Sequence, residues 1–111
     1  YIGDGVFELL VRAYVCRNGI TMAKNLHRAV VKYVNAAAQA GMSKRLLPLL
    51  TDEERAVWLR GRNTKSTHTP KGASDAEYHF ATALECVFGW LYLKNRAERI
   101  TELFNALIEN C

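Results

Sequence analysis

Apolar residues recur every three or four positions along most of the chain, and the alternating pattern of a half-buried strand is nearly absent. This periodicity predicts an all-α fold. The expected helices span residues 4–17, 21–41, 43–50, 52–60, 74–94 and 96–110. Only 2 Pro and 7 Gly interrupt the pattern, and no low-complexity run is present. We therefore expect residues 1–111 to form one compact helical domain.

Several helix boundaries carry their own signals. Asn18-Gly19 supplies the left-handed residue with which helices commonly end. Thr51-Asp-Glu-Glu54 and Ser74-Asp-Ala-Glu77 are capping-box patterns, in which a hydroxyl and a glutamate three residues later satisfy free backbone N–H groups. Gly61 is expected to end the helix that begins at residue 52. The polar residues 63–73 are expected to form an exposed loop.

Half of the 111 residues are hydrophobic, which is enough for one core. The best candidate for a membrane span, residues 80–93, is shorter than the roughly 20 apolar residues that cross a bilayer, and it contains Glu85. No signal-peptide pattern opens the sequence. Cys16, Cys86 and Cys111 are odd in number and widely spaced, which argues against a disulfide framework or a zinc site. These features predict a cytoplasmic protein with no membrane partner.

The net charge of +4 is unevenly distributed along the chain. Residues 1–73 contain 12 Lys and Arg against 5 Asp and Glu, whereas residues 74–111 contain 3 against 6. The stretch 55–73 contains five basic residues and no acidic one. A basic segment of this kind suits a polyanionic partner, because neutralising phosphates releases condensed counterions. A solvated loop and helix face explains the same charge, and charge alone favours that alternative.

Two acidic residues are the main candidates for chemistry. Asp4 lies at the start of the first expected helix, where the commoner role of an aspartate is to cap the helix. Glu8, one turn further on the same face, is either a second carboxylate of a site or a solvated residue. Glu85 is the only charged residue within 80–93. Because burial of an unpaired carboxylate is costly, Glu85 needs an Arg or Lys partner, or a divalent cation shared with another carboxylate. The residue pattern leaves both possibilities open.

The segment Arg60-Gly-Arg-Asn-Thr-Lys-Ser66, continued by Thr69-Pro-Lys71, mixes guanidinium, ammonium, amide and hydroxyl donors. These groups bind phosphates and ribose hydroxyls where a protein reads the shape of RNA, although an ordinary solvent loop has the same composition. The residues expected to contact an RNA backbone are Arg60, Arg62, Asn63, Lys65 and Lys71. Three further residues either extend that surface or form a solvated helix face: His27, Arg28 and Lys32. The sequence contains no P-loop and no nucleophile-elbow pattern.

Several segments, in matching order, carry a resemblance to a known family. Tyr1-Ile-Gly-Asp-Gly-Val6 resembles the ribonuclease III signature, which opens a catalytic helix. Residues 83–93 (ALECVFGWLYL) resemble the second acidic segment of that family, an apolar helix with one glutamate followed by Gly and a Tyr-Leu ending. Residues 60–66 with the following Pro-Lys, residues 34–40 (VNAAAQA) and the expected absence of a double-stranded RNA-binding domain are similar to the Mini-III branch. The resemblance spans nearly the whole chain.

The resemblance implies a ribonuclease III-like endonuclease fold in which Asp4 and Glu85 are catalytic carboxylates that bind Mg²⁺. It further implies hydrolysis of double-stranded RNA to products with a 5′-phosphate and a 3′-hydroxyl, a homodimer whose two sites cut opposite strands, and maturation of large-subunit (23S) ribosomal RNA. Full-length ribonuclease III usually has an aspartate at the position of Thr82, so the number of bound metal ions stays open. Two alternatives remain: an RNA-binding or ribosome-associated module with weak or no cleavage, and a helical interaction domain with no nucleic-acid role.

Overall fold

The computed structural model describes residues 1–19, 22–64 and 74–109. The elements are α1 (Ile2–Arg17), α2 (Ala23–Val31), α3 (Ala36–Leu46), the 3₁₀-helix η1 (Leu47–Leu49), α4 (Asp52–Arg62), α5 (Asp75–Leu93) and α6 (Ala97–Ile108). Within these described ranges there is no strand, and the predicted all-α fold is confirmed.

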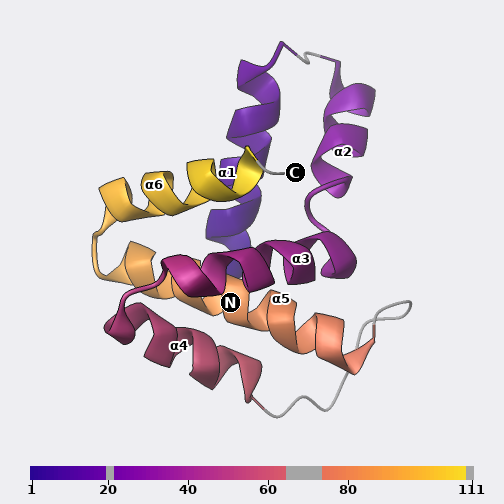
Figure 1. Cartoon of the computed structure of the whole chain (residues 1–111). Coiled ribbons are helices and arrows are strands. Elements are labelled where there is room, and N and C mark those ends of the chain that lie inside the picture. Colours follow the sequence, from indigo (N-terminus) through magenta and orange to yellow (C-terminus); the bar gives the residue numbers. More distant parts are fainter. Residues whose placement is uncertain (20–21, 65–73, 110–111) are drawn as a thin grey trace.

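The long helix α5 lies at the centre of the fold, with α1, α3, α4 and α6 packed against it (Figure 1). Its buried residues are Ala81, Ala83, Leu84, Val87, Phe88, Gly89 and Leu91. A helix that is apolar on most sides has to be enclosed by neighbours, which explains its central place. Phe7 of α1 joins α5 to α6, because its ring centroid lies 5.8 Å from that of Phe88 and 6.2 Å from that of Phe104.

The helices α1 and α2 lie side by side and extend away from α4 (Figure 1). Tyr14 of α1 contacts Tyr33, just beyond α2, with ring centroids 6.0 Å apart. The N-terminal end of α1 reaches the middle of α5, whereas its C-terminal end lies far from that helix (Figure 1). The connection after α1 begins at Gly19, whose φ of +85° confirms the left-handed stop expected for Asn18-Gly19.

The prediction of a continuous helix over 21–41 is wrong, because a turn at residues 32–35 separates α2 from α3. Asn35 forms this corner. Its side chain accepts a hydrogen bond from the Ala38 N–H at 2.9 Å and donates to the carbonyl oxygen of Val31 at 2.8 Å. The expected separate helix over 43–50 is also wrong, since α3 continues through Gly41 to Leu46 and only the 3₁₀ turn follows.

Gly61 does not end α4, which continues to Arg62. A Cβ atom on Gly61 would lie 2.9 Å from both the Cα atom of Ala83 and the Sγ atom of Cys86, closer than real Cβ contacts. The glycine therefore serves the close packing of α4 on α5. The capping boxes that begin α4 and α5 are both confirmed. Residues 65–73 of the expected loop lie outside the described residues.

A buried ion pair joins α4 to α6. The Glu54 side chain is 3% exposed and accepts hydrogen bonds from Nε and Nη2 of Arg99 at 2.9 and 2.8 Å. Arg99 also donates to the carbonyl oxygen of Leu49 at 2.9 Å. The hydrogen bond from Arg99 outweighs the effect of burial and lowers the pKa of Glu54. Among the described helices, none has both the length and the apolar character needed to cross a membrane.

Candidate active site

The backbone at the start of α1 lies directly against the middle of α5. A Cβ atom on Gly3 would lie 1.7 Å from the carbonyl oxygen of Glu85, and one on Gly89 would lie 2.8 Å from the backbone nitrogen of Gly3. Real Cβ atoms essentially never approach other atoms within 3.0 Å, so both positions exclude a side chain. The two glycines allow the approach that brings the neighbouring residue, Asp4, to Glu85.

Asp4 lies in the first turn of α1 and is exposed. Tyr1 is the N-cap of that helix, and no side chain forms a capping hydrogen bond there. The capping role, which was the commoner expectation for Asp4, is therefore wrong. Its carboxyl group instead lies within hydrogen-bonding reach of the carboxyl group of Glu85. The structure thus brings together the two acidic residues that the sequence analysis singled out.

Burial raises the pKa of Glu85 to about 7, and the hydrogen bond and negative charge of Asp4 act in the same direction. Within the described residues, no Lys or Arg forms an ion pair with Glu85. The sequence analysis left two kinds of partner open for Glu85, a basic side chain or a shared cation. The described residues provide no basic partner. Two neighbouring carboxylates repel when both are ionised, so this arrangement favours either a bound proton or a bound cation.

A third polar side chain, Gln39 of α3, lies beside Glu85, and hydrogen bonding from its amide lowers the pKa of Glu85 against the larger effect of burial. Gln39 is 7% exposed, and its buried Nε2 atom forms no hydrogen bond of full geometry, so this interaction with Glu85 is a loose one. Buried amide donors without partners are uncommon in native proteins. The sequence analysis did not single out Gln39. The signal that marks it is a lone polar residue among four alanines in residues 36–40 (AAAQA).

Glu85 lines an open cavity of about 480 Å³ between the start of α1, the C-terminal half of α4 and one side of α5. Arg60, Thr64 and Thr82 line the same cavity. The Thr82 hydroxyl donates a 2.9 Å hydrogen bond to the carbonyl oxygen of Tyr78. The Thr82 hydroxyl hydrogen is therefore bound to the backbone of α5 and is not donated into the cavity. Among the predicted RNA-binding residues that the structure describes, Arg60 is the one that lines the cavity with Glu85.

The other predicted RNA-binding residues are placed differently. The guanidinium carbon of Arg62 lies 5.4 Å from the ring centroid of Phe80, and the Lys44 Nζ atom lies 5.0 Å from the same centroid. Arg62 also donates a 3.2 Å hydrogen bond to Asn63, the C-cap of α4. Arg62 and Asn63 are exposed but do not line the cavity with Glu85. Lys65 and Lys71 lie outside the described residues.

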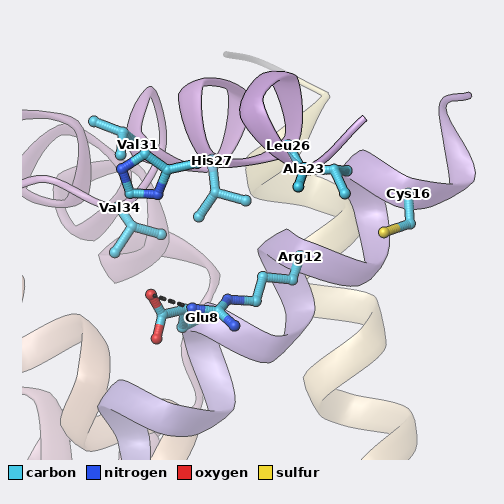
Figure 2. Close-up of a pocket in the computed structure, with 9 residues that line it drawn as sticks. Glu8, Arg12, Cys16, Ala23, Leu26, His27, Val31 and Val34 are labelled. Atoms are coloured by element: carbon cyan, nitrogen blue, oxygen red, sulfur yellow. Dashed lines mark ion pairs between the residues drawn. The ribbon is translucent and has the colours of Figure 1, made fainter. Parts of the chain in front are cut away.

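Glu8 is not part of this cluster. It forms an ion pair with Arg12 at 3.4 Å, and both residues line a second cavity, of about 370 Å³, between α1 and α2 (Figure 2). The cavity wall is mostly apolar, and His27 projects toward it from α2 (Figure 2). Among the described residues that form that wall, Glu8 is the only carboxylate. This second cavity is therefore separate from Glu85 and its pairing with Asp4.

Comparison with known proteins agrees with this geometry. Residues 1–96 match the ribonuclease III domain family. Mini-ribonuclease 3 from Symbiobacterium thermophilum is 42% identical over 106 residues, covering 96% of this chain and 82% of that protein. Mini-ribonuclease 3 from Clostridium tetani is 40% identical over 109 residues, covering 97% and 72%. A crystal structure of a Fusobacterium nucleatum protein matches with a TM-score of 0.87 and 31% identity, covering 97% of this chain and 88% of that one.

The chain therefore belongs to the ribonuclease III family. Within that family, the relatives that it matches over almost its full length are Mini-ribonuclease 3 proteins, in agreement with the resemblance stated above. The chain is accordingly an endoribonuclease. The alternative of a helical interaction domain with no nucleic-acid role is wrong.

Proposed function

We propose that this endoribonuclease depends on Mg²⁺ and cleaves double-stranded RNA. The observation that carries the proposal is the pairing of Asp4 with Glu85. Two carboxyl groups from different helices lie within hydrogen-bonding reach of each other, in a member of the ribonuclease III family. Glu85 lines an open cavity, and no described Lys or Arg forms an ion pair with it. Two carboxylates at an open surface can bind a hard cation that at the same time binds a phosphate of the substrate.

The residues present fit Mg²⁺ better than a cation that needs an all-protein cage. In the described parts of the chain, no group of three or more His, Cys, Asp or Glu gathers at one point. Mg²⁺ is commonly held by one or two carboxylates, keeps several water molecules and also binds substrate phosphates. The amide of Gln39 lies beside the pair, where it can donate a hydrogen bond to a carboxylate oxygen of Glu85.

In the proposed reaction, Asp4 and Glu85 hold the ion, and Arg60 orients the RNA. When bound, Mg²⁺ activates water for attack and neutralises charge that develops on the scissile phosphate. Glu85 has to be ionised to bind the cation, and because its pKa is about 7, protons compete with the cation for its oxygen atoms near neutral pH. The guanidinium of Arg60 lines the same cavity and would bind a backbone phosphate near the cleaved bond. No protein nucleophile is required.

The proposed RNA-binding surface consists of Arg60, Arg62, Asn63, Lys65 and Lys71. Arg60 has the strongest structural support, because it shares a cavity with Glu85. Arg62 and Asn63 follow at the end of α4 and are exposed, so they would contact the backbone further from the cleaved bond. Lys65 and Lys71 are supported by the basic character of their segment alone.

We also propose a homodimer. Large apolar side chains are exposed on α1 and near the end of α5: Ile2, Leu9, Tyr92 and Leu93. Of these, Leu9 is 68% exposed and Leu93 is 66% exposed. Ile2 and Leu93 also border the cavity that contains Glu85. Contact with a second copy would cover such side chains and place two sites along one duplex. Residues 1–111 would act as one catalytic domain in that assembly.

Following the resemblance to the Mini-III branch, we propose that the substrate is a precursor of 23S ribosomal RNA and that cleavage takes place in the cytoplasm. A cleavage assay tests the core of the proposal. A long RNA duplex should be shortened by the protein with Mg²⁺ to products with 5′-phosphates, and EDTA should stop the reaction. Asp4→Asn should abolish cleavage while circular dichroism and RNA binding stay close to wild type. Comparison of a 23S precursor duplex with an unrelated duplex tests the substrate.

Cleavage by Asp4→Asn at the wild-type rate, or cleavage that EDTA leaves unchanged, would contradict the proposed site. Retardation of the duplex on a gel without any shortening would favour the RNA-binding module with weak or no cleavage. Thr82, whose hydroxyl bonds to the backbone of α5, is the residue that makes this second outcome worth testing.

A further inference from the structure

Gln39 lies on the side of α3 that packs against α5. Its backbone N–H donates to the carbonyl oxygen of Asn35 at 2.9 Å, so the residue lies within the first turns of α3. The side chain is more than nine-tenths buried, and its amide lies beside the carboxyl group of Glu85. The corner at Asn35 and the packing of α3 together fix this placement.

Buried polar side chains in the described part of the chain are few: Gln39, Ser43 and Glu54. Ser43 accepts a 2.9 Å hydrogen bond from the indole N–H of Trp58. Glu54 is bound by Arg99. The Nε2 atom of Gln39, in contrast, forms no hydrogen bond of full geometry, although its amide is close enough to the Glu85 carboxyl group for hydrogen bonding to lower the pKa of Glu85. An apolar side chain would fill the same space without leaving a poorly satisfied donor, so packing alone does not account for an amide at this position.

The chemical type of Gln39 suits a neighbour of two carboxylates that bind a cation. A neutral amide can donate to one oxygen of Glu85 and restrict its rotation without adding charge. A lysine or arginine here would neutralise the pair and repel a divalent cation, and a third carboxylate would increase the repulsion within the metal-free protein. Groups that orient metal ligands in this way strongly affect metal affinity.

We propose that Gln39 is a positioning residue of the metal site, whose buried amide holds the Glu85 carboxylate in the orientation that a divalent cation shared with Asp4 requires. This inference rests on the proposed metal-dependent function. The cation is bound by Asp4 and Glu85, and Gln39 acts through Glu85 alone.

Calorimetric titration of Mn²⁺ into the full chain without RNA tests the inference. Gln39→Met keeps the length of the side chain and removes the donor, and it should weaken Mn²⁺ affinity by about tenfold or more. Cleavage by the same variant should fail at low Mg²⁺ and recover at high Mg²⁺, because the ligands themselves remain. If Gln39→Met does not fold, Gln39→Asn serves as the second variant, because it keeps an amide but shortens its reach. It should also bind Mn²⁺ more weakly than the wild type.

Ser43→Ala is the matched control, because it removes a buried hydrogen bond one turn further along α3. It should lower thermal stability and leave Mn²⁺ affinity unchanged. Wild-type Mn²⁺ affinity in Gln39→Met or Gln39→Asn would overturn the inference and leave the proposed function intact. Absence of Mn²⁺ binding in the wild type, together with full cleavage by Asp4→Asn, would overturn both.

Discussion

A Cβ atom on Gly3 would lie 1.7 Å from the carbonyl oxygen of Glu85, so the backbones of α1 and α5 touch where the two candidate ligands meet. The separation between the main chains of Asp4 and Glu85 is consequently set by the packing of the two helices. Sites built on rigid helices hold their geometry better than sites on loops. The contact therefore links the stability of the fold directly to the arrangement of the site.

Gly3→Ala should damage both properties. The added methyl group collides with main-chain atoms of α5, which cannot rotate away, so the start of α1 has to move. We expect a loss of about 1–3 kcal/mol in the free energy of unfolding and a fall in cleavage rate of tenfold or more, on the order expected when reacting groups are misplaced. Urea unfolding and a single-turnover cleavage assay measure the two effects.

The control for this substitution lies two residues further along the same helix. A Cβ atom on Gly5 would meet nothing within 4 Å, so Gly5→Ala should be neutral or stabilise the protein by up to about 1 kcal/mol. Equal behaviour of the two variants would show that the close approach of α1 to α5 does not matter.

Glu85→Gln should stabilise the metal-free protein at alkaline pH. The pKa of Glu85 in the folded protein, about 7, exceeds the ordinary value of 4.5, so the folded state binds this proton more tightly than the unfolded state. Folding stability should then fall as pH rises from 4.5 to 7 and stay low above that range. Removing the charge should recover on the order of 2 kcal/mol at pH 8, while cleavage is lost.

Urea unfolding in EDTA at pH 5 and pH 8 measures this effect. The difference between Glu85→Gln and the wild type should be large at pH 8 and small at pH 5. A variant that is less stable than the wild type at pH 8 would mean that the Glu85 carboxylate is well compensated without a cation, against the argument from its burial beside Asp4.

Arg60 and Arg62 should contribute unequally to RNA binding. Arg60 lines the cavity with Glu85, whereas the guanidinium of Arg62 packs over Phe80. In the Asp4→Asn background, which separates binding from cleavage, Arg60→Ala should weaken duplex binding several-fold. It should also reduce the slope of log affinity against log salt by about one. Arg62→Ala should have a smaller effect on both. The reverse order would place the duplex across the end of α4, where Arg62 packs over Phe80 of α5.

Arg99→Met should destabilise the fold without weakening the metal site. It leaves the Glu54 carboxylate buried and unpaired, which costs about 3 kcal/mol or more at pH 7. The pKa of Glu54 is lowered in the folded state, so its stabilising contribution is present above pH 4.5 and is lost as pH falls through the folded pKa. The deficit of the variant should therefore shrink at pH 3. Thermal unfolding at both pH values measures it.

Arg96→Met is the matched control for that substitution. Arg96 pairs with Glu53 at 2.9 Å, but both side chains are largely exposed, and its guanidinium lies over Trp90. Exposed pairs and cation–π contacts of this kind contribute about 1 kcal/mol or less. If the two variants lost equal stability, burial of Glu54 would not be the reason for the importance of Arg99.

The sequence predicted best what depends on neighbouring residues. Both capping boxes and the stop at Gly19 act within four residues, and each lies where the pattern indicated. The pattern failed where contacts between distant segments determine the structure. Gly61 was expected to end a helix, but the helix continues, and the glycine is explained by its packing against Cys86. The long helix expected over 21–41 is divided at Asn35, whose side chain caps the start of α3.

The same distinction applies to the site. The isolation of Glu85 in an apolar helix indicated that it needs a partner, but periodicity carries no information on which partner reaches it. The resemblance to ribonuclease III identified Asp4, and the structure places it beside Glu85. Gln39 escaped notice, because its burial follows from how α3 lies on α5 and not from the alanines around it.

The Asn35 side chain, which forms the corner between α2 and α3, also influences where Gln39 lies. One exposed amide both closes the end of α2 and starts α3, so the direction in which the chain resumes after the turn depends on a single surface side chain. Without this change of direction, residues 36–46 would continue along the axis of α2 and could not lie along α5 as α3 does (Figure 1). A surface residue that belongs to neither carboxyl-bearing helix thus helps to bring Gln39 to Glu85.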